Sequence, residues 1–182
     1  PNFKGDKRRS HTHECKTDPD ARLYKKAPGQ ASRLCYIGHV LTDNRHALVV
    51  DSQTTVASGT AEVDAALTML DRRPGTRRLT VAADKNYDQK RFVAGARAAN
   101  VTPHVAQHTR GRRSAIDART TRHAGYAQSR NARHRVETPF GWGKFNRPLK
   151  QTMLRGLARV GAQATLVFTS YNLVRIAALE AA

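Results

Sequence analysis

The chain has 182 residues, of which 39% are hydrophobic, enough for one ordinary hydrophobic core. Lysine and arginine number 32 against 14 acidic residues, giving a formal net charge of +18. Such an excess of positive charge indicates a polyanionic partner, and nucleic acid is the first candidate. The sequence has no run of about 18 apolar residues, so we expect no membrane span. Two cysteines are too few for a disulfide scaffold.

Residues 1–32 are polar and charged, which predicts an extended basic segment without a core of its own. The segment has no signal-peptide pattern, and together with the sparse cysteines this favours the cytoplasm. The sequence begins at Pro1 instead of methionine, so we expect the translated protein to start further upstream. His11, His13 and Cys15 alternate and could bind Zn²⁺, but a fourth ligand at conventional spacing is missing, which disfavours a zinc site.

Residues 33–107 predict a sheet with helices. Hydrophobic residues lie on both faces of a strand over 34–41 and again over 47–50, with turn-forming residues 42–45 between them, which predicts an interior hairpin. The rest of the pattern predicts, in chain order, a helix at 61–70, a strand at 79–83, a helix at 89–99 and a short strand at 103–107. This order is typical of an α/β domain with a mixed sheet, and we expect one domain over 1–182.

The carboxyl-terminal part is the most basic, because eleven basic residues stand against two acids in 110–150. Residues 108–130 show no periodicity, so we expect a mobile basic loop there. Residues 131–182 predict two helices. The first covers 131–145, and the second begins near Leu157, from which apolar residues recur every three or four positions.

Two acids stand where metal chemistry could be built. Asp84 follows the predicted strand at 79–83, and strand ends are where α/β sheets place active sites. Glu137 lies in the basic segment, on a helical face shared with Arg133 and Lys144. For Glu137 alone, an ion-paired helix face is the simpler interpretation. Together the two carboxylates could hold the Mg²⁺ (or Mn²⁺) ions that phosphodiester cleavage uses, since these ions prefer oxygen ligands.

Two segments around these acids carry a family resemblance. Residues 82–88, Ala-Ala-Asp-Lys-Asn-Tyr-Asp, and 133–142, Arg-His-Arg-Val-Glu-Thr-Pro-Phe-Gly-Trp, resemble the second and third catalytic blocks of insertion-sequence DDE transposases of the IS-five-like group. Arg133, Glu137 and Lys144 fit the Tyr, Arg, Glu, Lys spacing of the third block, with Arg130 in the Tyr position. Shorter matches lie at 17–21, 59–62, 120–123 and 171–175, so the resemblance covers nearly the whole chain.

The resemblance implies a ribonuclease-H-like α/β fold and a metal-dependent enzyme that cleaves and joins DNA by phosphoryl transfer. It implies that Asp84 and Glu137 are catalytic metal ligands, and that a first Asp lies on an opening strand. We find no strand before Arg33, so we expect a carboxyl-terminal fragment that lacks this strand and is inactive alone. Asp51 is the one substitute for the missing ligand, although a capping or turn role is the simpler interpretation.

The resemblance also implies double-stranded DNA as the partner, both transposon ends and target, and allows a homodimer of the intact parent at the bacterial nucleoid. We expect phosphate contacts from Arg112, Arg113, Arg130, Arg133, Arg135 and Lys144. Phe140 and Trp142 are expected to pack their helix against the sheet. Two alternatives remain: a catalytically inactive nucleic-acid-binding remnant, and an RNA-associated basic protein that would prefer structured RNA.

Overall fold

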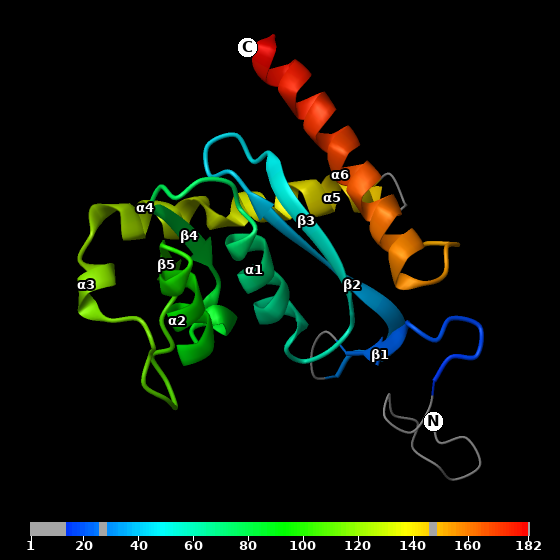
Figure 1. The fold of residues 1–182 in the computed structure, drawn as a ribbon, viewed down its shortest axis with the longest axis horizontal. Helices are drawn as coiled ribbons and strands as arrows, with labels where there is room; N and C mark the ends of the chain where they lie inside the picture. Colours follow the sequence, from blue (N-terminus) through cyan, green and yellow to red (C-terminus); the bar gives the residue numbers. More distant parts are fainter. Residues whose placement is uncertain (1–13, 26–28, 146–148, 182) are drawn as a thin grey trace. The chain divides into compact units, whose positions relative to one another are not determined.

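The computed structural model describes residues 14–25, 29–145 and 149–181. The chain forms two compact units, each assembled from separated stretches of sequence (Figure 1). The first unit consists of Pro1–His39, Ser52–Glu62 and Trp142–Ala182, and the second of Val40–Asp51 and Val63–Gly141. A single domain was the expectation from sequence, and no shift in composition marks the points where the chain passes from one unit to the other.

One three-stranded sheet has the order β1-β2-β3, formed by β1 (Arg22–Tyr24), β2 (Arg33–Thr42) and β3 (Val49–Val56). β1 pairs antiparallel with β2, and Leu23 stands opposite Leu34. The expectation that no strand precedes Arg33 was therefore wrong. A strand of three residues is too short to show the alternation by which strands are predicted.

The turn between β2 and β3 is longer than predicted. The carboxylate of Asp43 accepts the backbone N–H of His46 at 3.0 Å and that of Leu48 at 2.7 Å. Between them Ala47 adopts a positive φ of 61°. The second strand consequently begins at Val49 and continues through a polar stretch that the sequence pattern did not assign to it. Most residues of both strands are half-buried, so the predicted interior position of the hairpin was wrong.

In the first unit, α6 (Leu157–Glu180) confirms the predicted carboxyl-terminal helix. Its buried residues recur every three or four positions: Val160, Ala164, Val167, Phe168 and Tyr171. Asp20 accepts the backbone N–H of Leu157 at 2.9 Å, and Asp18 accepts that of Gly156 at 3.2 Å. These two acids satisfy donors that the first turn of a helix leaves without partners, and their charge suits the positive end of the helix dipole.

The second unit is built around a parallel strand pair. Its elements in chain order begin with α1 (Ala61–Asp71), of which all but the first two residues belong to this unit, and continue with β4 (Leu79–Ala83), η1 (Lys85–Tyr87), α2 (Lys90–Ala98) and β5 (Val101–Val105). Leu79 stands opposite Val101 and Ala83 opposite Val105. The core contains Val63, Leu70, Phe92, Val93, Ala96, Val101, Val105 and Ile116. The structure confirms the predicted helices and the strand at 79–83, while β5 begins two residues earlier than predicted.

Two helices lie in the segment 108–130, for which the sequence predicted a loop. They are α3 (Ala118–Thr121) and α4 (Ala124–Ala132). Asp117 caps α3 by accepting the backbone N–H of Thr120 at 3.2 Å. The hydroxyl of Tyr126 donates to the carbonyl oxygen of Val105 at 2.8 Å and joins α4 to β5. These helices depend on tertiary contacts, which a short basic sequence cannot reveal.

The predicted helix at 131–145 is interrupted. Residues Arg133–Val136 form the 3₁₀ turn η2, and α5 spans Glu137–Phe145. Pro139 lacks an N–H and would clash with the carbonyl of residue 135 in a continuous α-helix, but it is tolerated in the first turn of α5. Since a 3₁₀ turn has three residues per turn, Arg133 does not share the α-helical face of Glu137 that the spacing predicted.

Candidate catalytic site

Asp84 stands directly after β4, at the carboxyl-terminal edge of the parallel pair. It is the N-terminal cap of η1, and its Oδ1 accepts the backbone N–H of Asn86 at 2.7 Å. The side chain is half-buried, and its Oδ2 makes no hydrogen bond to the described residues. The cap therefore orients the carboxylate through one oxygen and leaves the second available to a cation.

Glu137 is the first residue of α5 and is exposed. It makes no ion pair with any described residue, although the segment around it is strongly basic. Its neighbour Arg135 instead donates to the carbonyl oxygens of Asn44, at 2.7 Å, and Arg45, at 3.0 Å. The simpler interpretation of Glu137, a salt-bridged helix face, is therefore not what the described side chains form.

A groove of about 390 Å³ in the second unit is bordered by the elements that lead into both acids. Its lining includes Val81 and Ala82 of β4 and Arg133 and Val136 of η2. Ala82 precedes Asp84 by two residues, and Val136 directly precedes Glu137. The tertiary structure thus brings together two segments that are about fifty residues apart in sequence, although neither Asp84 nor Glu137 itself lines the groove.

The donor chemistry of the two acids suits a hard divalent ion. Mg²⁺ is commonly held by one or two carboxylates, with water and substrate phosphates completing its coordination. Within the described ranges, no three His, Cys, Asp or Glu side chains are grouped closely enough to hold a metal ion. Asp84 and Glu137 would therefore contribute two ligands at most, fewer than a triad of carboxylates.

The basic residues predicted to contact DNA are exposed, but their surroundings differ. Arg112 and Arg113 lie in the loop before α3. The guanidinium of Arg130 stands 5.8 Å from the ring centroid of Tyr126, a cation–π distance. Lys144 lies on the part of α5 that belongs to the first unit.

The loop from His108 to Ala115 is anchored by a buried acid that sequence reasoning gave no role. Asp88 is 1% exposed, and its carboxylate accepts the backbone N–H of His108 and that of Ala115, each at 2.7 Å. Burial alone would raise the pKa of Asp88, but these bonds, Ser114 and the charge of Arg112 together lower it. Asp88 therefore holds the two ends of the segment 108–115 together, and the exposed arginines lie between them. This part of the predicted mobile loop is fixed at both ends by hydrogen bonds.

Asp51 lies within β3 and forms a two-pronged ion pair with Arg72, at 2.6 Å and 2.8 Å. Asp51 is therefore neither the turn residue nor the cap residue that the sequence suggested. Because both of its oxygens accept hydrogen bonds from Arg72, the carboxylate is poorly placed to bind a metal ion. Trp142 packs on α6, with its ring centroid 6.0 Å from that of Tyr171. His11 and His13 lie outside the described residues.

Small sheets with flanking helices and an acid at a strand end define a mixed α/β domain that is consistent with a ribonuclease-H-like DDE domain. The transposase DDE domain family matches residues 7–173, and the chain belongs to this family. The family carries out DNA transposition by phosphoryl transfer on DNA and typically uses divalent metal ions.

No curated protein and no solved structure gave a significant match to the chain. Among the described helices, none is both long and apolar enough to cross a membrane.

Proposed function

We propose that Asp84 and Glu137 are the metal-binding carboxylates of a DNA strand-cleaving and strand-joining site, in a member of the IS-five-like group of transposases. The observation that carries the proposal is the groove in which β4 and η2 meet, since it borders the segments leading into both acids. The unpaired state of Glu137 among the described side chains supports it, because an exposed acid in a basic field is available to a cation.

In phosphoryl transfer, the two acids of the chain would bind metal ions and its basic residues would bind DNA phosphates. The capped carboxylate of Asp84 is preorganised by Asn86, so ligand binding would cost it little side-chain freedom. Divalent ions held there would neutralise charge on the phosphate and activate water or a 3′-hydroxyl. Arg112, Arg113, Arg130, Arg133, Arg135 and Lys144 would hold backbone phosphates of transposon ends and target DNA. A third acidic ligand would come from outside the described residues.

Metal binding by the chain tests the assignment. The variants Asp84→Asn and Glu137→Gln are suitable, because Asn retains the capping ability of Asp84 and Gln retains the length of Glu137. We expect each variant to bind Mn²⁺ about tenfold more weakly or worse, because removing even a residue that only hydrogen-bonds to a metal ligand costs that much affinity. Electron paramagnetic resonance measures the binding of Mn²⁺. Asp71→Asn removes an exposed acid of the same unit and is the control. Wild-type affinity in both site variants would end the assignment.

An inactive nucleic-acid-binding remnant is the second candidate, favoured by the absence of a three-residue metal group among the described residues. In that case DNA binding would fall steeply with salt and would show no preference for terminal inverted repeats. A strand-cleavage assay separates the two functions. In an active transposase, Asp84→Asn and Glu137→Gln should abolish cleavage in Mg²⁺ while leaving DNA binding largely intact.

A further inference from the structure

A second polar cavity lies in the second unit, away from the two candidate carboxylates. Its volume is about 720 Å³. We call it the arginine pocket. Its lining comprises Arg78, Arg97 and Arg119 with Asp117, together with Thr80, Thr102, Thr120, His104, His123 and Gly125. Arg78 and Arg97 were not among the DNA-contacting residues expected from sequence.

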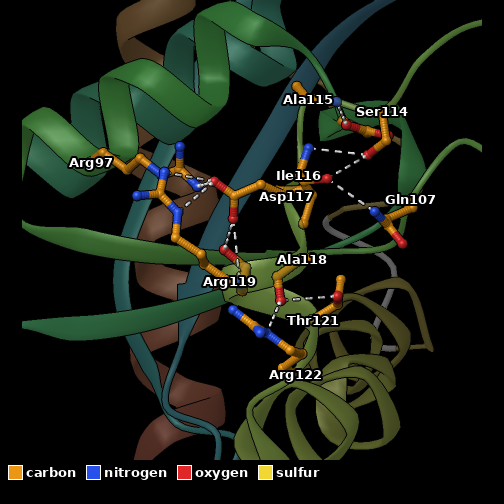
Figure 2. Close-up of polar contacts among 12 residues, drawn as sticks. Arg97, Gln107, Ser114, Ala115, Ile116, Asp117, Ala118, Arg119, Thr121 and Arg122 are labelled. Atoms are coloured by element: carbon orange, nitrogen blue, oxygen red, sulfur yellow. Dashed lines mark hydrogen bonds and ion pairs between the residues drawn. The ribbon is translucent and has the colours of Figure 1, made fainter.

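One carboxylate holds two of the arginines in place. Asp117 accepts from Arg97 at 3.1 Å and from Arg119 at 3.0 Å, both through Oδ2, and Figure 2 shows these bonds as dashed lines. The hydrogen bond from Arg119 is the main reason why the pKa of Asp117 is lowered to about 2. Asp117 also caps α3 through the backbone N–H of Thr120. The pair is therefore built into the fold and does not depend on two freely moving side chains.

The pocket keeps an excess of positive charge. Three arginines face a single aspartate, so the lining carries a net charge of +2 when its histidines are neutral. Arg78 donates to the hydroxyl of Thr102 at 3.1 Å, which fixes the third guanidinium without neutralising it. The side chains of Arg97 and Arg119 are 40% and 81% exposed, so both can reach a ligand from solvent.

The arginine pocket runs along β4 and β5 from Arg78 to His104, the register partner of Ala82, and Asp84 does not line it. Arg78 directly precedes β4 and Asp84 directly follows it. Thr80 and Thr102, which also line the pocket, are partners in the register of the parallel pair. Six residues of extended chain span about 20 Å, so a phosphate bound at Arg78 would be distinct from a phosphate held at Asp84.

The lining selects a phosphate instead of a base. Guanidinium groups match the oxygens of phosphate, with threonine hydroxyls as additional donors, whereas the lining holds no Phe, Tyr or Trp on which a base could stack. We propose that the arginine pocket binds a backbone phosphate of duplex DNA, as a sequence-independent contact separate from the catalytic site. The proposal rests on DNA being the partner of this transposase domain.

Two substitutions with opposite expected effects on DNA binding test the pocket in the full chain, with a short duplex DNA as the probe. Arg78→Gln removes a phosphate contact, so the slope of log affinity against log salt should be smaller by about 1. The affinity lost between about 50 and 200 mM salt would then be roughly 3.5-fold smaller than in the wild type. Lys90→Gln removes an exposed charge on α2 outside the pocket and should leave the slope nearly unchanged.

Asp117→Asn should act in the other direction. Asparagine caps helices as well as aspartate, so α3 is retained, while Arg97 and Arg119 lose the anion that competes with the ligand. Duplex affinity at low salt should rise by about two- to fivefold, the contribution of an exposed ion pair. An unchanged or weaker affinity for Asp117→Asn, or an Arg78→Gln slope equal to that of Lys90→Gln, would overturn the pocket assignment. So would tighter binding of duplex RNA that depends on the same residues.

The outcome also separates this inference from the proposed function. If the wild type binds duplex DNA and the pocket variants do not differ from it, only the pocket assignment fails, and the metal-binding result for Asp84 and Glu137 is unaffected. If the wild type binds no duplex DNA, the DNA partner and the pocket assignment fail together.

Discussion

Asp88 lies 27 residues before Ala115 in the sequence, yet its carboxylate accepts the backbone N–H of Ala115 at 2.7 Å. The same carboxylate accepts the backbone N–H of His108 at 2.7 Å. A single buried acid thus closes the base of the loop that carries exposed arginines. The loop has few other buried groups, so its shape depends on this carboxylate.

Replacing Asp88 should destabilise the second unit and open the loop. In Asp88→Ala, two buried backbone N–H groups lose their acceptor, and each unsatisfied donor costs about 1–3 kcal/mol, so we expect a loss of roughly 2–4 kcal/mol in the free energy of unfolding. Urea unfolding measures this loss, and trypsin cleavage at Arg112 and Arg113 should become faster. The isosteric Asp88→Asn retains one acceptor and should be less severe. Slow cleavage and wild-type stability in Asp88→Ala would show that the loop is held by other contacts.

His39 should make the stability of the first unit depend on pH. The imidazole of His39 is 7% exposed and is hydrogen-bonded to Thr55 at 2.8 Å, and burial lowers its pKa from 6.5 to about 4. The folded state binds a proton at His39 less readily than the unfolded state does. The stability that the neutral imidazole contributes is therefore complete above pH 6.5 and is lost as the pH falls towards 4. Between pH 7 and 4.5 this loss amounts to about 2–3 kcal/mol.

A comparison of the wild type with His39→Gln separates the effect of His39 on stability from the effects of the acidic residues and the other histidines. Urea unfolding at pH 7 and 4.5 should show that the wild type loses about 2–3 kcal/mol more than the variant, because glutamine does not titrate. Between pH 7 and 8 the difference between the two proteins should stay constant. Parallel losses in both proteins on acidification would mean that His39 is not the group responsible.

Two glycines of α5 should respond in opposite ways to alanine. A Cβ at Gly143 would overlap the side chain of Leu149 and lie 2.9 Å from Cγ1 of Val167, which is too close. Gly143→Ala should therefore destabilise the first unit by about 1–3 kcal/mol through overpacking. At Gly141 a Cβ would meet no atom within 4 Å, so Gly141→Ala should be neutral or stabilise by up to about 1 kcal/mol through helix propensity. Thermal unfolding distinguishes them, and shifts of the same sign would contradict the packing argument.

Local patterns in the sequence predicted elements that depend mainly on their own residues. The strand that precedes Asp84, the helix at 61–70 and the long helix from Leu157 were all confirmed, because each carries apolar residues at a spacing that is visible in the chain. The match to the transposase DDE domain confirmed the family that the segments around Asp84 and Glu137 had indicated. The metal-binding role of these two acids stays a prediction.

Elements that exist through contacts between distant residues were missed. β1 pairs with β2 over three residues only, the cap residue of α3, Asp117, is bonded to Arg97, and α4 is held by the bond from Tyr126 to Val105. The sequence shows Pro139, but only the structure shows that η2 interrupts the helix and that α-helix resumes at Glu137.

By itself, the sequence determined the charge and the α/β character, since these follow from composition and from periodicity along the chain. Asp84 and Glu137 were indicated by the resemblance to the family, and their role stays a prediction. Only the tertiary structure decided that Asp88 closes a basic loop, that Asp51 is bound by Arg72, and that three arginines surround one cavity. The physical reason is that a charged side chain has no periodic signature: its role depends on which partner the folded backbone brings within hydrogen-bonding distance.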